Sequence, residues 1–177
     1  PGKGYAIRAP QGYTTTPQVF SGEFIGVPNN GNISANVAGF NPALLNYNLL
    51  ANPYPSAINV ITLLDNTNLG TLYFWTHNSA ITNNVFTSSD YAIRTRTTGI
   101  AAVTGGTAPG LNIAAGQAFF ASAGTTTTIN FTNAMRVAGN NAQFYRNTQD
   151  VPLNYYVHLN LTNTLGATNL RRFATLD

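Results

Sequence analysis

The side chains of this chain that could act as acids, bases or nucleophiles are few, and their spacing favours no catalytic arrangement. A hydrolase triad would need Ser79, His77 and Asp90, with Ser56 as an alternative nucleophile. Neither serine has the surroundings of a nucleophile elbow. Glycoside cleavage needs two carboxyl groups at a set separation, and the chain has only five acidic residues from which to draw them. We therefore expect no enzyme activity, and a hydrolase remains an alternative in which these few polar groups converge in space.

Metal and cofactor chemistry have equally little support in the sequence. His77 and His158 lack a paired ligand spacing such as His-x-His. The acidic residues do not cluster into the runs that calcium sites prefer. Gly2-Lys3-Gly4 lacks the further glycines and the following helix of a phosphate-binding loop. Because cysteine is absent, thiolate ligands and disulfides are also absent. We expect neither a bound metal nor a cofactor.

The aromatic residues are better candidates for a binding site. Residues 73–75, Tyr-Phe-Trp, lie in one predicted strand, where alternation places the first and third on one face and the second on the other. One interpretation is that these rings fill the core of a β-sandwich. The alternative is that Trp75, together with Tyr54, His77 and Asn78 near a strand end, forms a stacking platform with amide hydrogen bonds for a sugar.

Tyr54 stands between Pro53 and Pro55, and this fixes the backbone on both sides of it. The segment is interpreted either as a structural corner or as a loop that presents the tyrosine to a ligand. Both interpretations remain open at this point.

Arg94 and Arg96 are the candidates for contact with an anionic group. They share one face of a predicted strand, so both could bind a carboxylate or a sulfate. The alternative is that both are solvated, or that their stems cover apolar surface.

The composition limits the partners of the protein. Charged residues make up only 7% of the chain, against a usual ~25%, and asparagine and threonine together supply roughly a quarter. The net charge of +3 comes from eight basic and five acidic residues. Since no basic run exceeds Arg171-Arg172, we expect no nucleic-acid partner. No stretch approaches the ~20 apolar residues of a membrane-spanning helix, so we expect no membrane insertion.

The hydrophobic pattern predicts β-structure. Helical periodicity is nearly absent, while short runs of β-branched and aromatic residues recur between turn clusters. The predicted strands are Gly4–Arg8, Gln18–Gly26, Asn46–Leu50, Thr71–Thr76, Tyr91–Arg96, Gln117–Ala121, Thr126–Thr132 and Tyr155–Asn163. One short helix is predicted over Ala57–Leu64, with Ser56 as its N-cap. The sequence therefore predicts an all-β fold, a single antiparallel, jelly-roll-like β-sandwich with at most one short connector helix. It forms one domain over residues 1–177, expected to be a fragment of a longer secreted protein.

Several segments in order carry a resemblance to a known family. The most specific are Asn-Pro-Tyr-Pro-Ser at 52–56 and Tyr-Phe-Trp-Thr-His-Asn at 73–78. The others include Gly2-Lys3-Gly4-Tyr5, Pro28-Asn29-Asn30-Gly31-Asn32, Asp90-Tyr91-Ala92, Gly116-Gln117-Ala118-Phe119-Phe120, Met135-Arg136-Val137, Gln143-Phe144-Tyr145-Arg146 and Leu159-Asn160-Leu161-Thr162-Asn163. Over nearly the whole chain, these segments resemble a family of surface proteins from Bacteroidetes of the Flavobacterium type, which the type IX secretion system exports.

The resemblance implies a location more than an activity. It implies a β-rich module that precedes the C-terminal sorting domain of a long secreted protein at the outer cell surface. With the missing catalytic groups, this leads us to expect a non-catalytic extracellular module for adhesion or surface structure. The alternatives are a carbohydrate-binding module of a larger secreted protein and a self-assembling filament subunit, because asparagine and threonine ladders favour stacking between copies. The expected partners are accordingly a polysaccharide, other surface proteins, or further copies of this chain.

Overall fold

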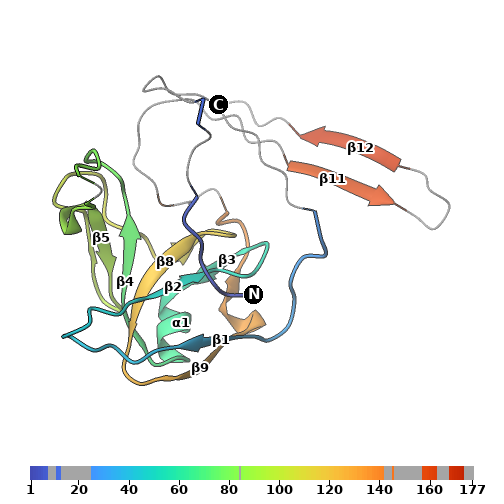
Figure 1. Cartoon of the computed structure of the whole chain (residues 1–177). Coiled ribbons are helices and arrows are strands. Elements are labelled where there is room, and N and C mark those ends of the chain that lie inside the picture. Colours follow the sequence, from blue (N-terminus) through green and yellow to red (C-terminus); the bar gives the residue numbers. More distant parts are fainter. Residues whose placement is uncertain are drawn as a thin grey trace. The chain divides into compact units, whose positions relative to one another are not determined.

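The computed structural model describes residues 1–7, 11–12, 25–83, 85–141 and 145, and the backbone of two further strands. The chain divides into two compact units, Pro1–Asn147 and Thr148–Asp177, which we describe separately. In the second unit, β11 (Val157–Thr162) pairs antiparallel with β12 (Thr168–Phe173) (Figure 1). His158 lies in β11. The expectation of one domain over residues 1–177 stays a prediction.

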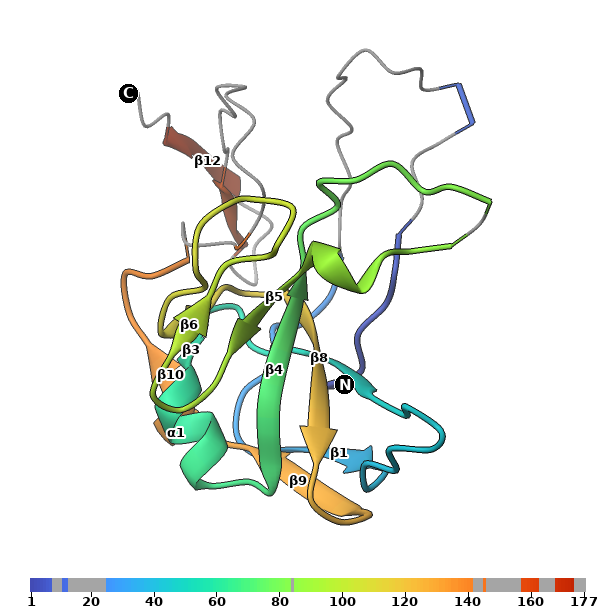
Figure 2. The ribbon, with the colours of Figure 1, turned by 90° about the vertical axis from the view of Figure 1, so that its left-hand side faces the viewer.

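A five-stranded antiparallel sheet is the largest element of the first unit. Its strand order is β2-β8-β4-β5-β6, and Figure 2 shows β5, β4 and β8 as neighbours. The strands are β2 (Asn48–Ala51), β8 (Ala118–Ala123), β4 (Leu69–Trp75), β5 (Tyr91–Arg94) and β6 (Gly99–Ile100). The N-terminal segment lies along β2, where Lys3 bridges to Leu50. The next residue must be a glycine, because a Cβ on Gly4 would lie 2.7 Å from the Leu50 carbonyl oxygen.

Smaller elements flank this sheet, and most of them pack on one of its faces. They are a two-stranded sheet, a three-stranded sheet, one helix of a turn and a half, and two 3₁₀ turns. Their bounds are β1 (Ile33–Val37) with β9 (Thr127–Phe131), β10 (Arg136–Val137) with β3 (Ala57–Asn59) and β7 (Asn112–Ile113), α1 (Val60–Asp65), η1 (Ser88–Asp90) and η2 (Asn133–Met135). None of the described sheets closes into a barrel.

One hydrophobic core joins the five-stranded sheet to these smaller elements. Alternation along β4 and β8 turns Leu72, Phe74 and Phe119 inward, where they are buried. Ile58 of β3 and Phe131 of β9 are buried in the same cluster from the other side. Burial of these large side chains stabilises the unit, since each contributes on the order of 1.5–3 kcal/mol relative to an exposed position.

The predicted all-β fold with antiparallel strands and one short helix is confirmed. The strands predicted over Asn46–Leu50, Thr71–Thr76, Tyr91–Arg96, Gln117–Ala121, Thr126–Thr132 and Tyr155–Asn163 correspond to β2, β4, β5, β8, β9 and β11. In Gly4–Arg8 the described residues 4–7 form no strand, and Arg8 lies outside the described residues. The strand predicted over Gln18–Gly26 falls mostly outside them as well, and its described residues, Ile25 and Gly26, belong to no strand.

The predicted helix begins three residues later than expected. Ala57–Asn59 forms β3, and the N-cap is Asn59 rather than Ser56. The Oδ1 atom of Asn59 accepts a hydrogen bond of 3.0 Å from the N–H of Thr62. Pairing of β3 with both β7 and β10 satisfies its backbone groups, so the tertiary environment overrides the local helical pattern.

Among the described residues, no helix has the length and apolar character required to cross a membrane.

Candidate functional site

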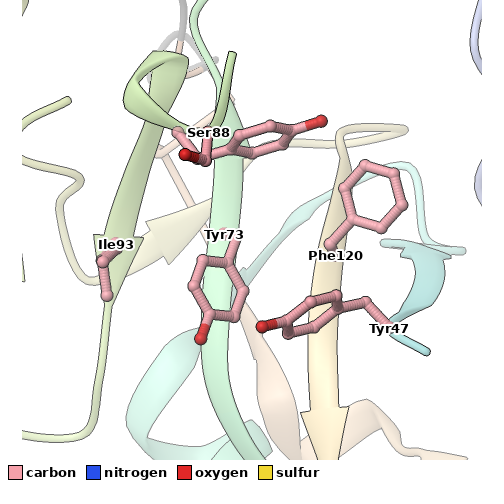
Figure 3. Close-up of a pocket in the computed structure, with 6 residues that line it drawn as sticks. Tyr47, Tyr73, Ser88, Ile93 and Phe120 are labelled. Carbon is pink, nitrogen blue, oxygen red and sulfur yellow. The ribbon is translucent and has the colours of Figure 1, made fainter. Parts of the chain in front are cut away.

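The outer face of the five-stranded sheet carries a groove of about 270 Å³. Figure 3 shows side chains from the sheet and its flanking loops around this space. The groove exists because the strands alternate. Phe119 and Phe74 point into the core, so Phe120 and Tyr73 must point outward. The groove is lined by Tyr47, Tyr73, Ser88, Tyr91, Ile93 and Phe120.

The register of the sheet brings the rings of the groove together. Tyr73 of β4 lies opposite Phe120 of β8 on one side and opposite Ile93 of β5 on the other. The ring of Tyr47 meets that of Tyr73 edge-on, with 5.1 Å between centroids. Tyr91 and Phe120 meet in the same way at 5.9 Å. Edge-to-face contacts are a preferred arrangement of aromatic pairs, so they stabilise the orientations of the rings that line the groove.

The groove is uncharged. None of the residues that line it is acidic or basic. Burial raises the pKa of Tyr73, and its hydrogen bond to Tyr47 raises it further. Burial likewise raises the pKa of Tyr91, and the negative charge of the nearby Asp90 raises it further. These phenols therefore stay neutral at physiological pH and offer hydroxyl groups beside apolar ring faces. Such a lining suits an uncharged ligand with both apolar and hydroxyl-bearing surfaces.

A second group of rings adjoins the groove at the end of β4. Trp75 lies opposite Tyr91 in the sheet register, and 38% of its surface is exposed. Its indole stacks on His77 at 4.6 Å with an interplanar angle of 19°, and it meets Phe86 edge-on at 5.5 Å. His77 has a positive φ of 53°, a left-handed conformation that is rare outside glycine and that concentrates at functional sites.

Asp90 anchors the loops behind this second group of rings. Its carboxylate is buried and accepts hydrogen bonds from the Thr104 hydroxyl (2.6 Å) and the Ser79 N–H (3.1 Å). Its backbone carbonyl accepts from both the N–H and the hydroxyl of Thr76. The Asn78 side chain donates to the Gly105 carbonyl at 2.8 Å and so joins the same two loops. The loops after β4 and β6 are therefore tied to each other.

Acid is expected to loosen these loops. Burial would raise the pKa of Asp90, but hydrogen bonds from Thr104 and Ser79, helped by the nearby His77, outweigh it and hold the pKa below its ordinary value. A lowered folded-state pKa stabilises the protein above the unfolded-state value of about 4, and this contribution is lost as pH falls further. We expect Asp90→Asn to be less stable than wild type at pH 7 by about 1–3 kcal/mol. The carboxylate accepts one hydrogen bond on each of its two oxygens, whereas the Asn amide has only one oxygen that can accept.

Urea unfolding at pH 7 and at about pH 3 tests this expectation, because the gap between wild type and Asp90→Asn should narrow in acid. A gap that stays constant across this range would contradict the stabilising role of the charged form. Asp65→Asn is the matched control, since that carboxylate is more exposed and pairs with Arg96 at the surface.

Tyr54 does not belong to the outer face. Only 2% of its surface is exposed, and its hydroxyl donates to the Gly31 carbonyl at 2.6 Å. The guanidinium of Arg136 lies over its ring, 5.3 Å from the centroid. Burial raises the pKa of this phenol, although Arg136 counteracts part of the effect. Neither face of the ring is open to a ligand, so the structure places Tyr54 as the corner that the flanking prolines also indicate.

Arg94 and Arg96 do not converge on a common site. Arg94 lies at the end of β5 and donates to the Pro109 carbonyl at 3.4 Å. Arg96 follows the strand and forms an ion pair with Asp65. The two arginines therefore contact different parts of the first unit.

Of the predicted site residues, the structure brings together Trp75 and His77, while the Asn78 side chain donates to the Gly105 carbonyl of the neighbouring loop. The lining of the groove was not predicted from the sequence, above all Tyr47, Tyr91 and Phe120. Phe120 could have been found from strict alternation after Phe119 in a predicted strand. Tyr47 precedes β2 and Ser88 lies in a 3₁₀ turn, so no strand pattern marks either residue.

Three residues of the hydrolase alternative lie near one another. The Ser79 N–H donates to the Asp90 carboxylate at 3.1 Å, and the nearby His77 helps to lower the pKa of Asp90. The alternative nucleophile, the Ser56 hydroxyl, accepts from the Arg136 side chain at 2.8 Å. Within the part of the chain that the structure describes, no three or more His, Cys, Asp or Glu side chains are grouped as a metal ion would require.

Comparison with known proteins gives a family. No curated protein and no solved structure matches the sequence. One family, described as a domain of unknown function (DUF8693), matches residues 1–170. Because this match covers nearly the whole chain, the protein belongs to that family.

Proposed function

We propose that this protein is a non-catalytic carbohydrate-binding module and that the aromatic groove on the outer face of the five-stranded sheet is its binding site. The observation that carries the proposal is the lining of the groove, in which aromatic rings and hydroxyl groups stand together without a charge. The aromatic rings favour stacking on the apolar face of a sugar, and the phenol and serine hydroxyls favour hydrogen bonds to its hydroxyl groups.

The size of the groove supports a sugar over a larger rigid ligand. Its volume of about 270 Å³ falls just below the range of roughly 300–1,000 Å³ that is usual for drug-sized ligands. One sugar ring is a better match than a multi-ring cofactor. The lack of charge in the lining argues further against nucleotides and other phosphate-bearing ligands, which need cationic or backbone N–H partners.

We place the module outside the cell, at the outer surface, as part of a longer secreted protein. Two features support this proposal. The chain has no cysteine and very few charges, and its segments resemble surface proteins exported by the type IX secretion system of Bacteroidetes. Binding to a polysaccharide is then the means by which the module serves adhesion.

A glycan array followed by isothermal titration calorimetry tests this function. We expect at least one neutral glycan to bind saturably, and Tyr91→Ala to weaken that binding about tenfold or more, because a central aromatic contact is typically worth ~2 kcal/mol. Ile100→Ala is the matched control. Ile100 is an exposed apolar residue on neighbouring β6 that does not line the groove, so its loss should leave affinity unchanged. Silence across the array, or equal losses in both variants, would reject the proposal.

A further inference from the structure

We propose that the binding site extends beyond the groove as a track of aromatic rings and that its ligand is a linear neutral polysaccharide, held along several sugar units. This inference rests on the proposed carbohydrate-binding function and specifies the ligand class. We name the feature the aromatic track, and it runs from Phe40 through the groove to Phe86.

The first part of the track leads into the groove from the loop that precedes β2. Phe40 and Tyr47 have ring centroids 5.0 Å apart, and Tyr47 in turn meets Tyr73 at 5.1 Å. The backbone of Phe40 is held to the sheet, since its N–H donates to the Ala123 carbonyl at the end of β8. The three rings form an unbroken series of contacts from that loop to the middle strand of the sheet.

The second part leads out of the groove towards the loop after β4. Tyr91 contacts Phe120 inside the groove and lies opposite Trp75 in the register of β4 and β5. Trp75 then meets Phe86. Trp75 and Phe86 are 38% and 54% exposed, so both are open to a ligand. An exposed pair of large rings is costly in water and is typical of a surface that binds a partner.

The track is too long for one sugar ring. The groove alone, at about 270 Å³, can hold one ring. Along β4, the step from Tyr73 to Trp75 adds roughly 7 Å, and each strand crossed adds roughly 5 Å. The rings beyond the groove can therefore contact only the further units of a chain. A linear polysaccharide presents an apolar ring face and hydroxyl groups at every unit, and this repeat matches the repeated aromatic rings and phenols of the track.

The loop at the far end of the track is held before a ligand binds. Asn78 joins it to the neighbouring loop through the Gly105 carbonyl, and Thr104 joins that loop to buried Asp90. The ring of His77 stacks on the Trp75 indole, with 4.6 Å between centroids. Because these contacts fix Trp75 in advance, an extended ligand loses less conformational entropy of the protein on binding.

Calorimetric titration of the whole chain with linear cello-, manno- and xylo-oligosaccharides, from the monosaccharide to the hexasaccharide, tests the inference. We expect affinity to rise with length, so that the hexasaccharide of the series that binds is about tenfold tighter than its disaccharide. Phe86→Ala should weaken hexasaccharide binding about tenfold, and by less for the disaccharide. Val85→Ala, at an exposed neighbouring position outside the ring contacts, should leave both affinities unchanged.

Two results would overturn this inference. If affinity does not change with length, or if Phe86→Ala and Val85→Ala behave alike, the aromatic track is not part of the site. If none of the three series binds, a linear neutral chain is not the ligand. In either case a saturable hit on the glycan array that is lost in Tyr91→Ala would preserve the carbohydrate-binding function, so the two failures are distinguishable.

Discussion

Replacing Phe119 by alanine is expected to lower the free energy of unfolding by about 3–5 kcal/mol, the usual cost of removing a buried phenylalanine. Only 1% of Phe119 is exposed, and its ring packs against Phe74 with 6.1 Å between centroids at the centre of the core. Since domains of this size are stable by only about 5–15 kcal/mol, this single change should remove a large share of the total. Urea unfolding followed by circular dichroism measures it.

The adjacent residue supplies a control of the same type on the opposite face. Phe120 points into the groove and is partly exposed, so Phe120→Ala should cost clearly less stability while it abolishes most of the glycan binding. Phe119→Ala at a temperature where it is still folded should bind nearly as wild type does. The two neighbouring substitutions thus separate folding from binding. Equal stability losses, or binding retained in Phe120→Ala, would contradict the assignment of the two faces.

Asn52→Ala is expected to be destabilised by about 3 kcal/mol or more, because several buried polar groups lose their partner at once. Asn52 is 2% exposed. Its amide nitrogen lies 2.8–3.1 Å from the carbonyl oxygens of Ser56, Ile113 and Ala114. Its Oδ1 atom accepts from the N–H of Tyr54 at 3.0 Å. One side chain therefore holds the Pro-Tyr-Pro corner against the strand β7 and the turn that follows it.

Asn66→Ala is the matched control for this effect. Asn66 is exposed at the end of α1 and makes one local side-chain bond to the Thr62 carbonyl. Its loss should change stability by only about 0.5 kcal/mol, as is usual for surface positions. Urea unfolding of both variants measures the two stability losses. Similar urea midpoints for the two variants would show that the buried hydrogen bonds of Asn52 contribute no more to stability than the surface bond of Asn66.

Much of the fold follows from local pattern. β4 and β8 were predicted to within two residues, because runs of β-branched and aromatic residues bounded by turn residues mark strands without reference to the rest of the chain. Six strands were not predicted, namely β1, β3, β6, β7, β10 and β12. Four of them, β3, β6, β7 and β10, have two or three residues each, too few to show an alternation, and each is a strand only through its partners in the sheet.

The candidate site was predicted only in part. Trp75 and His77 were singled out as a platform, and the structure stacks them at 4.6 Å. Tyr54 is predicted to lie with them near a strand end, and its flanking prolines fix the local backbone. The direction in which such a corner points nevertheless depends on what packs around it. Here the Gly31 carbonyl and Arg136 enclose it. Gly31 and Arg136 are both far from Tyr54 along the chain, so the local sequence could not indicate that they pack against it.

The sequence by itself determined the β class, the scarcity of charged groups and the two-sided character of β4 and β8, because composition and alternation are local properties of the chain. Tertiary structure alone decided which outward rings meet. Tyr47, Tyr73 and Phe120 come from three separate segments, and the strand order β2-β8-β4-β5 with its register makes them neighbours. Register is a non-local property set by core packing and backbone pairing, so the groove could not be found before the sheet was assembled.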